Sequence, residues 1–276
     1  MAILKQSGRY LLLLPGLLFL AIFMLIPLVL TISSTFVEDG NFSVSGYLNF
    51  LTDAYFLDIL WTTLYVALLT TFCCIVLAFP VATIFLEKDQ KKPFCLCLAI
   101  FPLLVSPIVR SFSWMIILGR NGLLNDFLLS IGMIQEPLTI LYTPVAVAIG
   151  LVHLFLPLMI VTLVGVMENI DTDYIRAAES LGASKTTAFL KVMFPLCMPG
   201  LLIGCTLVFV GSFTAYTTPA LLGGQQRVIS TFLYQNAITL NDWNTAAMIA
   251  TIMIVLTFFI TGIFQKLATK LNPGGS

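Results

Sequence analysis

Charged residues are scarce in this chain of 276 residues, of which only 9% are charged and 59% are hydrophobic. Acidic and basic residues number 13 each, so the formal net charge is zero. A soluble domain cannot bury that much apolar surface, whereas a bundle of helices can expose it to lipid. The neutral balance removes the electrostatic basis for a nucleic-acid partner. The composition therefore predicts an all-α integral membrane protein.

Residues suited to metal binding or catalysis are also few. The chain has a single histidine, His153, and six cysteines that fall in or at the ends of apolar segments without any C-x-x-C pair. We expect these cysteines to be small packing residues rather than metal ligands. The phosphate-binding pattern G-x-x-x-x-G-K-[ST] is absent, so no nucleotide site is expected in this chain. An integral membrane enzyme would need several polar groups clustered at one depth, and one histidine argues against it.

Six apolar segments are each long enough to cross a bilayer as a helix, which takes about 20 residues. The first has a basic start, but its apolar run is about twice the usual length for a secretory signal and no small-x-small cleavage site closes it. We interpret it as an uncleaved anchor, and residues 1–276 as a single transmembrane domain. The predicted spans are Tyr10–Phe36, Ile59–Leu86, Phe94–Leu118, Leu138–Met167, Leu196–Leu222 and Ala246–Leu267.

Basic residues gather on one side of this six-span topology. The opposite side, with the span ends that face it, holds only Arg110, Arg120 and Arg227. Positive charge is retained in the cytoplasm, so both termini and the loop 168–195 are predicted to be cytoplasmic. The residues that set this orientation are Lys5, Arg9, Lys88, Lys91, Lys92, Arg176, Lys185, Lys191, Lys266 and Lys270.

The loop 168–195 has the pattern of two short helices joined at a glycine. Asp171 can cap a helix, over residues 172–181, whose apolar residues recur at helical spacing, and Gly182 can end it in the left-handed conformation. Ser184 can then cap a second helix that reaches Pro195. A pair of alanines in the first helix permits close approach of a partner surface. A connector lying on the membrane interface explains the loop equally well on physical grounds, because the second helix is amphipathic.

This loop resembles the EAA motif of ABC-importer permeases, in which E-A-A is followed by three residues, a glycine, nine residues and I-x-L-P. Arg176 replaces the acidic first residue of the motif, and Glu179, one turn further on, is a candidate to replace its charge. The resemblance implies that the loop contacts a separate ATPase. The matching residues are Arg176, Ala177, Ala178, Gly182, Val192, Phe194 and Pro195.

Two further segments are similar to spermidine/putrescine-type permeases. They are Phe101–Asn125, with R-S-F-S-W at 110–114, and T-P-A-L-L-G-G at 218–224. The resemblance implies a type I ABC importer permease fold in the bacterial inner membrane, as the first of two permease subunits. It implies three partners: a homologous second permease, a cytoplasmic ATPase dimer that binds ATP and Mg²⁺, and a periplasmic or extracellular solute-binding protein. No cofactor is implied for this chain itself.

Aromatic residues near the outer ends of the third and fifth predicted spans form a candidate substrate path. Trp114, Phe213 and Tyr216 fall at similar predicted depths, and aromatic faces can hold ammonium groups by cation–π contact. Arg110 joins them because an ionisable residue inside a span is costly and often functional. Aromatic packing between spans, and snorkelling of the arginine, explain the same residues equally well. For His153 we expect a neutral interhelical hydrogen bond.

Asp and Glu are absent from the predicted spans, which matters because polyamines are cations. Either the acids at the outer face recruit the cation, or the second permease supplies the acids, or the solute is different. Permeases similar to this group also carry amino-acid derivatives, phosphonates, thiamine and ferric iron. A stand-alone secondary transporter would need intramembrane carboxylates and inverted repeats, and neither is visible. The sequence therefore favours an importer permease, with spermidine or putrescine as the favoured solute.

Overall fold

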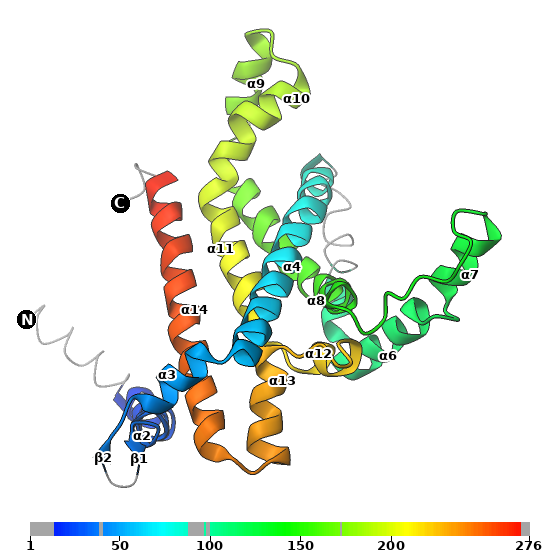
Figure 1. The fold of residues 1–276 in the computed structure, drawn as a ribbon. Helices are drawn as coiled ribbons and strands as arrows, with labels where there is room; N and C mark the ends of the chain where they lie inside the picture. The colour runs from blue at the N-terminus through cyan, green and yellow to red at the C-terminus, as the bar shows by residue number, and fades with distance from the viewer. Residues whose placement is uncertain (1–13, 39–40, 88–96, 98–99, 172, 272–276) are drawn as a thin grey trace, which may run out of the picture. The chain divides into compact units, whose positions relative to one another are not determined.

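The computed structural model describes residues 14–38, 41–87, 97, 100–171 and 173–271, and the described chain is mainly helical (Figure 1). Within these residues, five helices are long and apolar enough to cross a membrane, so the prediction of a multi-pass helical protein is confirmed. These candidate spans are Leu14–Ser34, Ala54–Ile84, Pro144–Glu168, Lys185–Thr214 and Trp243–Lys270.

The chain divides into two compact units, of which the first comprises residues 1–56 and 233–254. No residue in the apolar window of its first span is buried within the structure. Strands β1 and β2 pair in an antiparallel hairpin with Val37 opposite Phe42. The elements of this first unit are η1 (Ala21–Leu25), α2 (Ile26–Ser34), β1 (Val37–Glu38), β2 (Asn41–Phe42), α3 (Ser45–Thr52), η4 (Gln235–Thr239) and the start of α14 (Trp243–Leu271).

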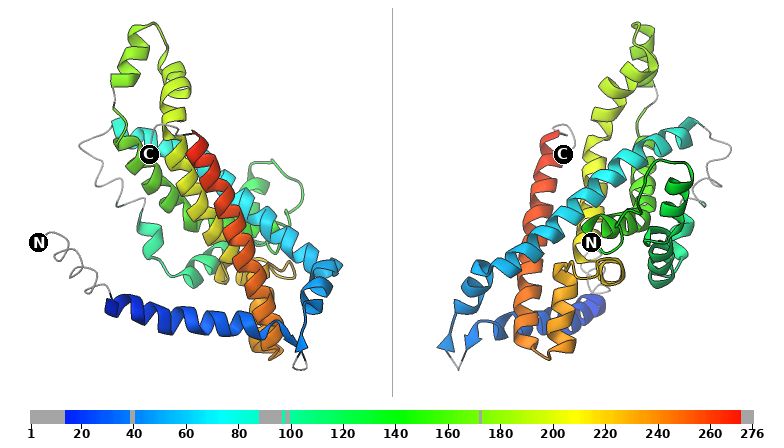
Figure 2. Two further views of the ribbon diagram at one scale, coloured as in Figure 1. Left: turned by 90° about the vertical axis from the view of Figure 1, so that its left-hand side faces the viewer. Right: turned by 45° about the vertical axis from the view of Figure 1, so that its right-hand side comes forward.

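The second unit comprises residues 57–232 and 255–276 and contains the larger core. Helices α8 and α11 lie side by side, and α6 and α12 pack together nearby (Figures 1 and 2). The prediction of one transmembrane domain is untested and stays a prediction. The elements are α4 (Ala54–Glu87), α6 (Pro107–Leu118), α7 (Leu123–Ser130), α8 (Pro144–Glu168), α9 (Asp173–Ser180), α10 (Lys185–Ala188), η3 (Phe189–Met193), α11 (Phe194–Thr214), α12 (Thr217–Leu222) and α13 (Ile229–Tyr234).

Glycines on α11 allow its close approach to α8. A Cβ atom added at Gly200 would lie 2.1 Å from Cγ2 of Val166, and one at Gly211 would lie 2.5 Å from the ring of Phe155. Small residues of this kind let helix backbones approach inside a membrane, where van der Waals packing replaces the hydrophobic effect as the main attraction. The thiols of Cys74, Cys197 and Cys205 are buried in the same core, as expected for packing cysteines.

Two predicted spans are interrupted rather than continuous. The predicted span Phe94–Leu118 breaks at Val105–Ser106, just before Pro107 begins α6, and residues 94–96 and 98–99 lie outside the described residues. The predicted span Leu196–Leu222 was wrong at its C-terminal end, because the helix that starts at Lys185 ends at Thr214 and is followed by a short α12. Proline explains the first break, since it lacks an N–H and disfavours helical backbone at the residue before it.

Candidate functional site

The loop between α8 and α11 folds as the two helices that its sequence predicts. Helix α9 ends at Ser180, and Gly182 follows with a φ of +91°, in the left-handed region. The N–H of Gly182 donates to the carbonyl of Glu179 at 2.9 Å, and the N–H of Ala183 donates to the carbonyl of Ala178 at 3.1 Å. This pair of bonds is the Schellman motif, which satisfies the free carbonyls at a helix end. The predicted glycine elbow is therefore confirmed.

Both helices of this loop begin at a capping side chain. Oδ1 of Asp171 accepts the N–H of Asp173 at 2.9 Å, just before α9. Oγ of Ser184 accepts the N–H of Thr187 at 3.2 Å and caps α10. These bonds satisfy donors that the first turn of a helix leaves free. The two predicted caps are thus present, and they fix where each helix starts.

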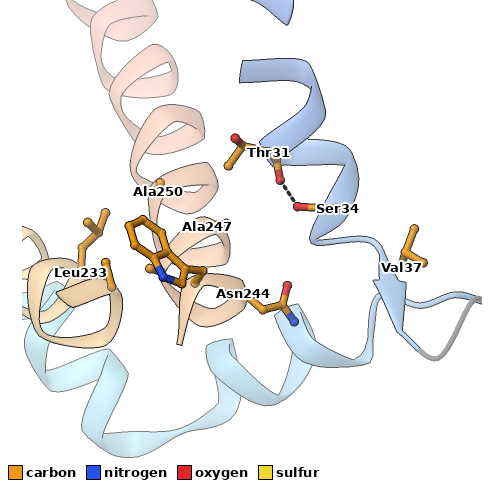
Figure 3. Close-up of a pocket in the computed structure, with 10 residues that line it drawn as sticks. Thr31, Ser34, Val37, Leu233, Asn244, Ala247 and Ala250 are labelled. Atoms are coloured by element: carbon orange, nitrogen blue, oxygen red, sulfur yellow. Dashed lines mark hydrogen bonds between the residues drawn. The ribbon is translucent and has the colours of Figure 1, made fainter. Parts of the chain in front are cut away.

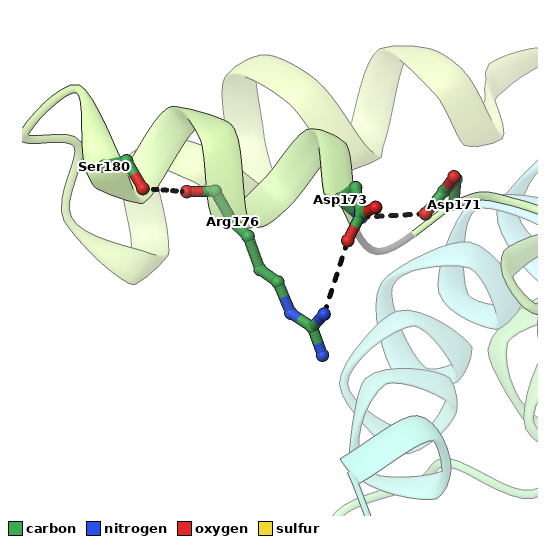
Figure 4. Close-up of polar contacts among 4 residues, drawn as sticks. All are labelled: Asp171, Asp173, Arg176 and Ser180. Carbon is green, nitrogen blue, oxygen red and sulfur yellow. Dashed lines mark hydrogen bonds and ion pairs between the residues drawn. The ribbon is translucent and has the colours of Figure 1, made fainter.

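Arg176 lies on the exposed side of α9 (Figure 4). Its Nη1 is 3.3 Å from Oδ1 of Asp173, and both side chains are 75% exposed. An exposed pair at this spacing contributes only about 0–1 kcal/mol to stability. The backbone carbonyl of Arg176 accepts the hydroxyl of Ser180 at 2.9 Å. The guanidinium therefore remains available to a partner at little cost.

Helix α9 presents apolar side chains away from the core of its own unit. Ile175 packs against that core, whereas Tyr174 is 60% exposed and Leu181 is 90% exposed. The alanine pair lies between these positions along the helix. Large apolar side chains exposed next to small ones are typical of a surface that another protein covers.

The second helix of the loop continues into the membrane without a break. Helix α10, the π-helical turn η3 and α11 form one helical segment, Lys185–Thr214, which passes through Pro195. Figures 1 and 2 show α9 and α10 at one end of α11. One continuous helical segment therefore runs from just after the elbow at Gly182 into the core of the second unit.

Among the candidate path residues, the structure joins Trp114 to His153. Nε1 of Trp114 donates to Nδ1 of His153 at 3.0 Å, and the two rings meet edge to face. Because tryptophan is only a donor, Nδ1 carries no proton and the imidazole is neutral, with its proton on Nε2. The interhelical hydrogen bond predicted for His153 is present, between α6 and α8.

Arg110 is buried, with 5% of its surface exposed. Its Nη2 donates to the carbonyl of Val105 at 3.1 Å, across the break that precedes α6. This carbonyl belongs to the backbone that the break leaves without helical partners, so the guanidinium satisfies it. Nη1 has no hydrogen-bond partner among the described residues. Arg110 therefore contacts the interrupted backbone, and no ion pair with an external acid is seen for it in this part of the chain.

Phe213 and Tyr216 have different surroundings from Trp114. Phe213 is fully buried and stacks on Phe209, with ring centroids 5.8 Å apart. Tyr216 is 39% exposed and lies at the break between α11 and α12. The sequence did not reveal that break, although Thr217–Pro219 was a signal for a new helix start. The exposure of these residues thus differs, and the substrate path stays a prediction.

A groove of about 660 Å³ lies within the first unit (Figure 3). Its wall is uncharged and rich in small residues, and the hydroxyl of Ser34 is already bonded to the carbonyl of Thr31 at 2.8 Å. Nothing in its lining selects one occupant over another. It is lined by Thr31, Ser34, Val37, Leu233, Ala237, Trp243, Asn244, Ala246, Ala247 and Ala250.

Five candidate spans, an exposed two-helix loop and interrupted helices together define a multi-pass membrane transport subunit. Residues 56–272 match the family model described as the binding-protein-dependent transport system inner membrane component. The chain belongs to this family, and it is a permease subunit of a binding-protein-dependent importer in the inner membrane.

Curated relatives cover nearly the whole chain. The spermidine/putrescine transport system permease protein PotB of Salmonella typhimurium (strain SL1344) is 31% identical over 92% of this chain and 91% of its own length. The protein of the same name from Escherichia coli K12 is 30% identical over 92% of this chain and 95% of its own length. The resemblance stated from sequence is therefore confirmed.

Solved structures share the fold at low identity. A chain of a bacterial ABC transporter that imports the acidic polysaccharide alginate matches with a TM-score of 0.78 and 14% identity, covering 98% of this chain and 99% of that one. A chain of the MetNI methionine ABC transporter matches with a TM-score of 0.60 and 16% identity, covering 76% and 93%. At these identities the likeness concerns the fold alone.

Proposed function

We propose that this permease is driven by a separate cytoplasmic ATPase dimer, which binds ATP and Mg²⁺ and contacts residues 171–195. The observation that carries the proposal is the exposed apolar side of α9, with Tyr174 and Leu181 uncovered beside the alanine pair. The contact residues are Arg176, Ala177, Ala178, Glu179, Gly182 and Pro195. The Schellman turn at Gly182 would hold the two helices at a fixed angle, so that motion of the ATPase reaches α11.

The topology that we propose has six spans, with both termini and the coupling loop in the cytoplasm. The sixth span is residues 94–118, whose described part is helical on both sides of the interruption at Val105–Ser106. The distribution of basic residues supports the orientation. A homologous second permease and an external solute-binding protein would complete the importer.

The solute that we propose is a polyamine, spermidine or putrescine. Two relatives at 30% and 31% identity carry that substrate class in their names. In the proposed path, Trp114 and Tyr216 are partly exposed and can contact an ammonium group, whereas Phe213 would do so only after α11 moves. Arg110, whose guanidinium bonds to the carbonyl of Val105 at the break before α6, would lie beside the path as a cation. The second permease would supply the acids that the spans of this chain lack.

The test is the ATPase activity of the purified importer in lipid, with its binding protein loaded in turn with spermidine, putrescine and unrelated solutes. Stimulation by a polyamine supports both the importer and its substrate. Stimulation only by an amino-acid derivative, a phosphonate, thiamine or ferric iron would keep the importer and replace the substrate. If no ATPase purifies with the chain, the importer proposal is wrong.

A further inference from the structure

An open hollow of about 470 Å³ lies in the second unit, where the segment before α8 meets the turn after α12. It is lined by Tyr142, Gly224, Gln225 and Gln226. The side chain of Tyr142 is 51% exposed, and both glutamines are exposed. The sequence analysis did not predict this hollow, because its two sides are about 80 residues apart in the chain.

The walls of the hollow are held by fixed backbone. Tyr142 has a φ of +66°, a left-handed conformation that is uncommon for an aromatic residue, and its N–H donates to the carbonyl of Leu222 at 3.1 Å. Gly224 has a φ of +58°, and a Cβ atom there would lie 2.7 Å from Cβ of Tyr142. The N–H of Gln226 donates to the carbonyl of Gly223 at 2.9 Å and closes a turn. A left-handed backbone at a residue such as Tyr142 is stable only when surrounding contacts hold it, and this conformation is frequent at functional sites.

The position of the hollow in the chain gives its side of the membrane. Tyr142 comes directly before α8, and the coupling loop comes directly after it. Helix α8 is long and apolar enough to cross the membrane once. The hollow and the coupling loop therefore lie on opposite sides of the bilayer. Under the proposed function, on which this inference rests, the hollow faces the solute-binding protein.

The chemistry of the lining selects the kind of partner. Two carboxamides and a phenol hydroxyl offer both donors and acceptors, and none of the lining residues is charged. Such groups match the N–H and C=O groups of a peptide backbone. They offer no carboxylate to a polyamine, whose groups are all cationic donors. We infer that the hollow receives an uncharged polar loop of the solute-binding protein.

The test is a titration of the lipid-reconstituted importer with its spermidine-loaded binding protein, read as ATPase rate. The variant Gln225→Ala/Gln226→Ala removes two carboxamides and leaves the turn, which is made by backbone atoms. The half-saturating concentration of binding protein should rise about tenfold, which corresponds to about 1.4 kcal/mol, while the maximal rate is retained. The ratio of variant to wild type should not depend on salt, because no charge is removed.

A matched control and a second readout complete the test. Gln265→Ala, an exposed glutamine in the second half of α14, should leave the half-saturating concentration unchanged. A photo-crosslinking residue placed at Gln225, but not at Gln265, should form an adduct with the purified binding protein.

Two results would overturn this inference without touching the proposed function. In the first, wild type and the double variant have equal half-saturating concentrations of binding protein, and no adduct forms at residue 225. In the second, the double variant has a lower maximal rate at an unchanged half-saturating concentration, which would place the hollow on the solute path. If no loaded form of the binding protein stimulates the wild-type importer, the proposed function is wrong, and so is the inference that rests on it.

Discussion

The indole N–H of Trp114 donates to Nδ1 of His153 across 3.0 Å and thereby joins α6 to α8. This bond fixes the proton of the imidazole on Nε2. It also occupies the only polar group of the tryptophan, which leaves the faces of its ring for other contacts. Structural and substrate-path roles of Trp114 can therefore be separated by experiment.

Replacing Trp114 by Phe keeps an aromatic ring and removes the N–H donor. In a double-mutant cycle with His153→Leu, the coupling between the two residues should be about 0.6 kcal/mol, as is usual for interhelical hydrogen bonds in membranes. Unfolding of the purified chain in mixed micelles measures this coupling. Strictly additive effects would show that the bond does not form. Unchanged polyamine uptake in a stably expressed Trp114→Ala importer would remove Trp114 from the proposed path.

Gly182 needs the left-handed backbone, and a substituent there would meet no other atom within 4 Å. A β-branched residue is therefore opposed by conformation rather than by contact. Gly182→Val should lower transport and solute-stimulated ATPase activity together, while expression is maintained. Gly182→Asn should retain much more of both, because asparagine tolerates this conformation better than other residues with a Cβ. Equal behaviour of the two variants would contradict the role of the elbow. Gly165→Ala, also in open space but without a positive φ, serves as the control.

Gly200 should tolerate no side chain while Val166 is opposite it. Overpacking of this kind costs about 1–3 kcal/mol, so Gly200→Val should lower the thermal stability of the chain in detergent. Adding Val166→Ala should restore part of that loss, because it removes the methyl groups at 2.1 and 2.7 Å and keeps Cβ, which is 2.9 Å away. Gly262→Ala, where nothing lies within 4 Å, is the control and should be nearly neutral. A failure of Val166→Ala to rescue would place the cause elsewhere.

Replacing Arg176 by Glu restores the acidic letter of the EAA motif. It also puts two carboxylates three residues apart on α9, where Asp173 now pairs with the arginine. The free energy of folding should change by only a few tenths of a kcal/mol. Coupled transport should fall if the partner ATPase is adapted to a guanidinium. The ratio of solute uptake to ATP hydrolysis in lipid vesicles measures this, and an unchanged ratio would remove Arg176 from the proposed contact.

Asp242 caps α14, and its contacts there lower its pKa. Hydrogen bonds from the side chain and the backbone N–H of Thr245 hold the pKa of Asp242 below its ordinary value of 3.8. The carboxylate therefore stabilises the fold above its unfolded-state pKa, and this contribution is lost as the pH falls through the lowered value. Asp242→Ala should cost about 1 kcal/mol at neutral pH, as cap removal usually does.

Chemical unfolding at neutral pH and at about pH 3 tests this prediction, because the stability difference between wild type and Asp242→Ala should shrink in acid. Glu136→Ala, which removes an exposed acid from the loop before α8, is the comparison. A difference between wild type and Asp242→Ala that does not depend on pH would exclude the carboxylate as its source.

The sequence predicted the two helices of the loop 168–195 well because local chemistry determines them. Asp171, Gly182 and Ser184 act on backbone within a few residues of themselves, so their types and spacing suffice to place both helices. The apolar segments were also recognisable from composition, since a bilayer demands length and hydropathy before anything else.

The ends of the spans were harder to predict because they depend on tertiary contacts. The helix that carries α11 ends at Thr214 although the apolar run continues to Leu222, and the carbonyl of Ala215 at this break accepts the hydroxyl of Ser230 at 2.5 Å. A hydrogen bond between residues 15 positions apart leaves no periodic signal in the sequence. The same holds for Trp114 and His153, and for the left-handed Tyr142, whose N–H is bonded to a residue from a distant segment.

The helix Lys185–Thr214 has 30 residues, which corresponds to a rod about 45 Å long. One end is the capped start at Ser184, and the other end is the interruption at Ala215–Tyr216. Two places inside this rod weaken its helical hydrogen-bond ladder: the π-helical turn Phe189–Met193, and Pro199 in α11. Under the proposed function, a push on the loop would reach these two places before it reaches the break beside Tyr216.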